Sequence, residues 1–256
     1  MIDLHCHILP GVDDGAQTLE ESIEMAKEAV EEGIETIVAT PQHMTSNFHN
    51  PNHSIISKVK DFNRELKAQG IPLEVLYGQE VRMNSEIMSA LETEELLSVN
   101  HKSKYIFIEL PYNMMPNYAK NVLYELQLAG YKPILAHPER NKVVQEQPDL
   151  LYHFVRNGAI MQVTAGSIVG KYGRSAQKLA FTMIEHNLAH VIASDARDTK
   201  KKKFYMKAAY DKMQKKYGTD TVYQFMENAS VILDGEMVYT DPPERMKTKK
   251  GLGIFS

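Results

Sequence analysis

Short apolar segments recur along the chain and alternate with longer segments that carry charge. The apolar segments are rich in Val, Ile, Leu or Tyr, and several of them contain almost no polar residue. Such continuous apolar runs are typical of parallel strands that are buried on both faces. We therefore expect strands at residues 2–8, 36–41, 73–81, 105–111, 132–139, 159–166 and 190–195.

The segments between these strands have apolar residues at helical spacing, with charged residues on the other face. Three of them end in Gly33, Gly70 and Gly130, the residue type most common just past a helix C-terminus. We expect helices at residues 19–33, 55–70, 118–130 and 175–187.

Strands that alternate with helices indicate a parallel sheet covered by helices. A closed or nearly closed barrel, of the distorted (β/α)7 TIM-like kind, is the preferred interpretation, and an open doubly wound sheet is the second. The second is disfavoured because the G-x-G-x-x-G fingerprint of dinucleotide-binding sheets is absent. We expect one domain over residues 1–241, followed by a proline-led, basic tail over residues 242–256 that is flexible or surface-bound.

Composition excludes several classes of function. The chain has 29 Lys and Arg against 33 Asp and Glu, a net charge of −4, which gives no electrostatic case for nucleic-acid binding. No apolar run approaches the roughly eighteen residues of a membrane span, and the first residues lack the features of a secretory signal. The single cysteine, Cys6, cannot form an internal disulfide, which fits a reducing cytoplasm. We expect a cytoplasmic protein whose oligomeric state is open.

Polar side chains gather at the ends of the predicted strands. In a parallel barrel the C-terminal strand ends lie at one face, where active sites form. Each of these residues has an ordinary structural explanation by itself, such as a solvated loop carboxylate. Together, directly after apolar residues, they predict one site. They are His5, His7, Gln42, His43, Glu80, Glu109, His137, Glu139, Arg140, Thr164, Asp195 and Arg197.

This mixture of residue types predicts a metal centre. Imidazoles and carboxylates without a thiolate suit manganese, iron or zinc, and His5 and His7 share one face of an extended strand. Two or three ions that share a bridging carboxylate commonly serve to hydrolyse phosphate esters. Arg140 can hold a phosphate with its planar guanidinium, unless it is a surface arginine.

Two further segments carry less specific signals. Asp14, in the Asp-Asp-Gly triplet after the first strand, is a turn residue, a further metal ligand or a proton donor to the leaving oxygen. The run Lys200–Lys203 is a solvated face or a basic mouth that attracts a phosphorylated substrate.

The motifs HCHILPGVDDG, IVATP, GQEV, IELP, AHPERN and ASDA resemble, in order and spacing, the polymerase and histidinol phosphatase (PHP) superfamily. They are most similar to the manganese-dependent protein-tyrosine phosphatases of Gram-positive bacteria, of the CpsB and YwqE type. The similarity covers essentially the whole chain, including ENASVIL near residue 230. It implies a distorted (β/α)7 barrel with three metal ions. The implied substrate is phosphotyrosine in proteins, notably the tyrosine-rich tail of a membrane-associated autokinase that controls capsular or exopolysaccharide synthesis.

The resemblance also implies roles for particular residues. Arg140 would bind phosphate, and a bridging carboxylate would be shared between two of the ions. The implied ligand sets are His5, His7, Glu80 and Asp195 for the first ion, Glu80, Glu109 and His137 for the second, and Asp14 with residues 42 and 197 for the third.

The chain departs from the family pattern at the third ion. Gln42 and Arg197 stand where the family has histidines, and Lys202 stands at a further family arginine. Glutamine is a weak neutral ligand, and arginine presents only hydrogen-bond donors. We therefore expect two ions, with the Arg197 guanidinium in the space of the third, paired with Asp14 or with substrate phosphate. His43 would face away from the position of residue 42 on an extended strand.

Three functions follow from these observations. The leading hypothesis is a metal-dependent phosphotyrosine phosphatase in which Mn²⁺ is the expected ion, with iron and zinc as alternatives. Its other catalytic residues would be Asp14, Arg140, Arg197 and Lys202. A second hypothesis is a catalytically weak or silent relative that binds phosphotyrosine without hydrolysing it, because third-ion ligands are replaced. A third is a phosphatase of small phosphomonoesters such as histidinol phosphate.

Overall fold

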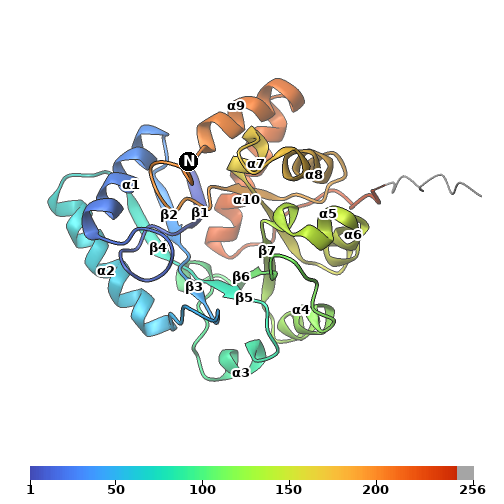
Figure 1. Ribbon diagram of the computed structural model, residues 1–256, viewed down its shortest axis with the longest axis horizontal. Coiled ribbons are helices and arrows are strands. Elements are labelled where there is room, and N and C mark those ends of the chain that lie inside the picture. The colour runs from blue at the N-terminus through green and yellow to red at the C-terminus, as the bar shows by residue number, and fades with distance from the viewer. Residues whose placement is uncertain (247–256) are drawn as a thin grey trace, which may run out of the picture.

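The computed structural model describes residues 1–246 as an α/β fold in which every strand pairing is parallel (Figure 1). Each of the seven predicted strands is present; the one at 73–81 is divided in two, and a short unpredicted strand follows the one at 36–41. The strands are β1 (Ile2–Cys6), β2 (Thr36–Ala39), β3 (Gln42–His43), β4 (Glu74–Tyr77), β5 (Glu80–Arg82), β6 (Tyr105–Glu109), β7 (Lys132–Ala136), β8 (Ile160–Thr164) and β9 (Val191–Ala193).

Helices surround the strands (Figure 1). The four predicted helices are α1 (Leu19–Glu31), α2 (Asn52–Ala68), α4 (Ala119–Leu128) and α8 (Arg174–Glu185). The pattern did not predict α3 (Ile87–Glu92), α5 (Lys142–Glu146), α6 (Asp149–Arg156), α7 (Ala165–Val169), α9 (Met206–Tyr217), α10 (Thr219–Asp234) and the 3-10 turns η1 (Val99–His101) and η2 (Pro138–Arg140).

The strands follow one another around a distorted barrel. One sheet has the order β1-β2-β4 and the other β3-β5-β6-β7-β8-β9. The two are continuous because β2 leads into β3 and β4 into β5 after two-residue interruptions. They also meet where Asp195 N donates to His5 O and His7 N donates to Ala196 O, each at 2.9 Å. The prediction of a barrel-like α/β fold with parallel strands is therefore confirmed.

Two apolar clusters account for the core. Inside the ring of strands, Leu4, Val38, Phe107 and Ile134 belong to one buried cluster, to which α10 contributes Ile232. A larger cluster lies between the strands and the surrounding helices. Helix α10 packs against β1 and β9 and covers the N-terminal end of the barrel. The opposite, C-terminal end is left for the polar residues.

Strand β1 contains a bulge that changes the direction of its side chains. Between Asp3 and Cys6, β1 has one residue more than its partner β2. Before this shift Leu4 joins the inner cluster, whereas Cys6 after it packs in the outer one. An inserted residue turns the following side chains to the other face. As a result His5 and His7 project into the barrel above Leu4.

The end of the described chain returns to the body of the domain. Glu244 N donates to His186 O at 2.9 Å, Arg245 forms an ion pair of 2.6 Å with Asp149, and Met246 is buried. The tail predicted for residues 242–256 falls mainly on residues 247–256, which lie outside the described residues. Within residues 1–246, no helix combines the length and apolarity needed to cross a membrane.

Candidate metal centre

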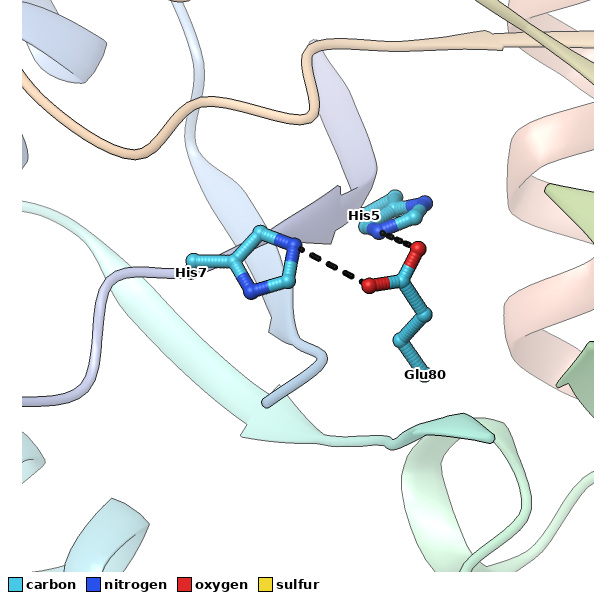
Figure 2. Close-up of side chains that lie close together, drawn as sticks. All are labelled: His5, His7 and Glu80. Atoms are coloured by element: carbon cyan, nitrogen blue, oxygen red, sulfur yellow. Dashed lines mark ion pairs between the residues drawn. The ribbon is translucent and has the colours of Figure 1, made fainter. Parts of the chain in front are cut away.

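Three imidazoles converge on one buried carboxylate at the C-terminal end of the barrel. Glu80, at the start of β5, lies with its Oε1 2.9 Å from His137 Nε2 and 3.3 Å from His5 Nε2. Its Oε2 lies 3.5 Å from His7 Nε2 (Figure 2). Asp195 completes the group, with its Oδ1 3.2 Å from His7 Nε2. All five side chains are buried, so the group is an ionisable cluster inside the fold.

His5, in β1, and His7, just after it, are oriented by hydrogen bonds to their outer ring nitrogens. His5 Nδ1 lies 3.1 Å from Gln162 Oε1, and His7 Nδ1 lies 2.6 Å from Asp13 Oδ2. Both oxygens can only accept, so each Nδ1 directs its proton outward and each Nε2 faces the carboxylates. Burial and Arg197 act to lower the pKa of His7, but Asp13 and Asp195 raise it to about 10, so an ion bound at its Nε2 would displace a proton. Both Nε2 atoms are buried without a hydrogen-bond partner among the described residues. Outer hydrogen bonds that free the inner nitrogen are the arrangement of metal-bound histidines.

Gln162 and Asp13 are therefore site residues that the sequence interpretation did not assign. Gln162 lies in the otherwise apolar strand β8, and its Oε1 also accepts a hydrogen bond from His137 N at 3.2 Å. A buried polar residue inside an apolar strand was the available signal. Asp13 additionally accepts from Gly15 N at 2.9 Å, which fixes its carboxylate in the turn after β1.

Two site residues have strained backbones. His137 has φ 34° and Asp195 has φ 49°, in the left-handed region that residues other than glycine rarely adopt. Such conformations cost about 1–3 kcal/mol and persist where the surroundings determine them. Asp195 N is bound to His5 O, and the preceding Ser194 donates from its N to Asp3 Oδ1 at 2.9 Å. This left-handed conformation turns the side chains of His137 and Asp195 inward just after their strands end.

Two carboxylates of the centre stay ionised despite their burial. Burial acts to raise the pKa of Glu80, but His5, His137 and His7 hold it well below its usual range. Burial acts likewise on Asp195, whose pKa is held well below its usual range by Arg197 and then Arg140. Glu80 and Asp195 therefore stay ionised beside the histidine nitrogens. Their two negative charges can offset the charge of a divalent cation.

Glu109 extends the centre to a second set of ligands. Burial, and then the charge of Glu80, raise the pKa of Glu109 to about 8, against the opposing effect of Arg82 at 2.7 Å. Burial and Arg140 lower the pKa of His137 to about 4, so its imidazole is neutral, the charge state that a histidine ligand has. Potential ligand atoms of Glu80, Glu109 and His137 lie within 4.8 Å of one another, as do those of His5, His7 and Glu80. The donor set fits two divalent ions that share Glu80.

Comparison with known proteins places the chain in a family. Residues 1–234 match the family described as "Capsular polysaccharide synthesis, CpsB/CapC". The chain belongs to the CpsB/CapC family. It is 42% identical to tyrosine-protein phosphatase YwqE of Bacillus subtilis, over the full length of both chains. It is 27% identical to tyrosine-protein phosphatase CpsB of Streptococcus pneumoniae, covering 93% of this chain and all of CpsB.

Comparison with solved structures also finds relatives of this family. A crystal structure from a study of YwqE and CpsB, described as "unique metal-dependent tyrosine phosphatases", matches 97% of this chain and all of its own with a TM-score of 0.94 at 42% identity. An organophosphorus hydrolase from Deinococcus radiodurans matches 91% of this chain and 92% of its own with a TM-score of 0.58 at 14% identity, which shows a common fold alone.

Arg197 enters the centre of this CpsB/CapC protein as a cation. Its Nε and one terminal nitrogen lie 3.1 and 2.9 Å from Asp195 Oδ1, and the same terminal nitrogen lies 3.5 Å from Glu80 Oε2. The other terminal nitrogen is paired with Asp14. Only 5% of its side chain is exposed. The guanidinium therefore bridges three carboxylates, among them Asp14, which the resemblance implies as a ligand of the third ion.

Lys202 and Gln42 are the other two residues at which the chain departs from the family pattern. Lys202 Nζ lies 3.3 Å from Asp14 Oδ2, on the partly exposed side. Gln42 is buried and pairs with Glu80 in the register of β3 and β5, and its backbone N donates to Asp13 Oδ2 at 3.0 Å. Asp14 thus meets two cations of the chain itself.

His43 faces away from this CpsB/CapC centre. Its Nδ1 accepts a hydrogen bond from Asn50 N at 3.1 Å, so the proton of the neutral ring is on Nε2. Burial and His49 lower the pKa of His43 to about 4. Although His43, His49 and Glu95 lie close together, a protonated Nε2 cannot ligate. His43 offers no replacement for the histidine that Gln42 lacks.

Arg140 lies at the rim of the centre. Its guanidinium is paired with Asp195 and lies 4.3 Å from the ring centroid of Tyr172. The ring holds one face of the guanidinium, as in a cation–π contact. Glu139, the preceding residue, is instead a structural group, since its Oε1 accepts from Ser167 Oγ at 2.6 Å and Thr164 N at 3.1 Å.

Replacement of Asp13 by asparagine is expected to weaken metal binding about 10- to 100-fold. The uncharged amide does not stabilise a proton on His7 Nδ1 as the carboxylate does. Its N–H can also donate to Nδ1, which would place the ring proton on Nε2, the atom that should bind the metal. Isothermal titration of the chelator-treated chain with Mn²⁺ measures the change. Asp149→Asn, which alters a carboxylate paired with Arg245 outside the centre, should bind as the wild type does. Equal affinity in Asp13→Asn would contradict the orienting role.

Proposed function

We propose that the chain is a metal-dependent protein-tyrosine phosphatase that works with two ions. His5, His7, Glu80 and Asp195 would hold one ion, and Glu80, Glu109 and His137 the other, with Mn²⁺ as the ion of first choice and iron or zinc as alternatives. The observation that carries this proposal is the pair of buried, unpartnered Nε2 atoms of His5 and His7 that face the ionised Glu80. Membership in the CpsB/CapC family and the names of YwqE and CpsB supply the reaction class.

Bound divalent ions would activate a water molecule and neutralise charge on the phosphate oxygens. The chain's own contribution is position and charge. Arg140 is fixed against Tyr172 at the rim, where its fork of donors can bind two phosphate oxygens. This requires it to exchange its contact with Asp195 for the substrate. The buried walls limit the access of other water to the reacting phosphorus.

Arg197 would act as a resident cation in place of a third ion. It is held by Asp14, Asp195 and Glu80, and guanidinium remains charged at any working pH. Together with Lys202 it supplies fixed positive charge beside Asp14. We assign Asp14 to holding these two cations rather than to proton transfer, since both of its oxygens are engaged.

The proposed substrate is a phosphotyrosine protein of the machinery for capsular or exopolysaccharide synthesis. The family description names that process, and the tyrosine-rich tail of a membrane-associated autokinase is the candidate we favour. In the run Lys200–Lys203, Lys200 and Lys201 are exposed, and the half-buried Lys202 borders the site through Asp14. They would attract a multiply phosphorylated tail by its charge.

Phosphate release from a tyrosine-rich phosphopeptide tests this function. The full chain is treated with a chelator and then reloaded separately with Mn²⁺, Fe²⁺ and Zn²⁺. We expect no release without metal, release after reloading, and slower turnover of histidinol phosphate than of the peptide. Tight peptide binding without release under every metal would indicate a silent binding protein instead. Faster turnover of histidinol phosphate would indicate a small-molecule phosphatase.

A further inference from the structure

An exposed aromatic side chain borders the proposed phosphate-binding residues. Tyr112, in the connection between β6 and α4, lines the same small cavity as Glu109, His137 and Arg140. Its side chain is 56% exposed. Among the large hydrophobic side chains that are exposed in residues 1–246, it alone lines this cavity.

The backbone around Tyr112 is fixed rather than loose. Tyr112 O accepts a hydrogen bond from Lys142 N at 3.1 Å. Asn141 Nδ2 donates to Pro111 O at 2.7 Å and to Met114 O at 3.1 Å, on either side of Tyr112. The Lys142 ammonium lies 5.5 Å from the centroid of the Tyr112 ring. Asn141 directly follows Arg140, so the segment that places the guanidinium also places the ring.

A single exposed aromatic residue is normal on a protein surface. Tyr112 differs because hydrogen bonds fix its backbone and hold it exposed beside Glu109, His137 and Arg140. The ring of Tyr172 already packs on the Arg140 guanidinium, with its centroid at 4.3 Å, whereas the Tyr112 ring lines the cavity beside it. If Arg140 binds the phosphate group of a phosphotyrosine, the aryl ring of that residue would lie near the Tyr112 ring.

We propose that Tyr112 determines specificity for aryl phosphates by receiving the ring of the substrate phosphotyrosine. This inference rests on the proposed phosphatase function. It adds the residue that contacts the aromatic ring of the substrate. An offset or edge-to-face contact between the two rings would favour phosphotyrosine over alkyl phosphate esters such as phosphoserine. Met114 and Tyr118, also exposed in this connection, extend the same surface for residues that flank the phosphotyrosine.

Kinetics of Tyr112→Ala, Tyr112→Phe and Tyr124→Ala in the metal-loaded chain test the inference. Tyr112→Ala should raise KM for a phosphotyrosine peptide about 3- to 10-fold, the range expected of an aromatic pair, with kcat changed less than KM. Tyr112→Phe retains the ring and should behave as the wild type. Tyr124 is exposed on α4 outside the cavity, so Tyr124→Ala should have no effect. Inhibition by inorganic phosphate, which has no ring, should be the same in all four proteins.

Direct binding separates this inference from the proposed function. Affinity for a non-hydrolysable phosphonate analogue of the phosphotyrosine peptide, measured by calorimetry, should fall in Tyr112→Ala by the same factor as KM rises. If the wild type releases no phosphate with any metal, the proposed function fails, and the binding comparison still decides the role of Tyr112. If Tyr112→Ala binds the analogue as the wild type does, or weakens inorganic phosphate equally, the role of Tyr112 is overturned.

Discussion

Replacement of Glu80 by glutamine is expected to lower the rate of phosphotyrosine hydrolysis by on the order of 10³-fold and to leave fewer than two ions per chain. Glu80 is fully buried and contacts His5, His7 and His137. It belongs to both proposed ligand sets, so a neutral amide weakens both at once. The amide also presents N–H donors where the ions need lone pairs.

A matched control separates loss of ligation from loss of a buried carboxylate. Glu139→Gln alters a carboxylate that is also fully buried but bonds Ser167 and Thr164 rather than the histidines. It should retain two ions and most of the activity. Phosphate release and elemental analysis of both variants, with circular dichroism to show that they fold, give the comparison. Two bound ions and wild-type rates in Glu80→Gln would refute the bridging role.

Replacement of Arg197 by methionine is expected to lower the free energy of unfolding of the metal-free chain by about 3 kcal/mol. Methionine keeps an unbranched apolar stem but has no charge, so Asp195 and Glu80, both fully buried, lose a cation that they share. Urea unfolding in the presence of a chelator, followed by circular dichroism, measures the loss. The effect should be smaller after metal loading, because bound ions supply the missing charge.

Lys202→Met is the control for this change. Lys202 also pairs with Asp14, but its side chain is 39% exposed. Solvated ion pairs contribute about 1 kcal/mol or less, so this variant should unfold close to the wild type. An Arg197→Met chain as stable as the wild type would show that the guanidinium does not balance the carboxylates.

The fold was largely predictable because the strands are short apolar runs and three of the helices end at glycines. The helix α10 was not predicted, although it closes the barrel through Ile232. Its role depends on contacts with β1 and β9 that only the folded chain brings together. The division of the predicted strand 73–81 into β4 and β5 was not predicted either. At Gly78 an added Cβ would lie 2.4 Å from Val38 Cγ1, a close approach that no local pattern encodes.

The residues of the centre were identifiable from strand ends and from the family resemblance, but their supporting groups were not. Asp13 and Gln162 become relevant only through the direction of the His7 and His5 rings. The bulge in β1 could not be predicted either, because it is defined by the register between β1 and β2. Tyr112 lies in a connection without any helical or strand periodicity, and its position beside Arg140 follows from hydrogen bonds of Asn141.

Counting metal ions tests the central claim that the guanidinium of Arg197 takes the place of a third ion. Elemental analysis of the wild-type chain after loading with Mn²⁺ and removal of excess metal should give two ions per chain. The double variant Gln42→His, Arg197→His restores two imidazoles beside Asp14 and should give three. Three tightly bound ions in the wild-type chain would contradict the account.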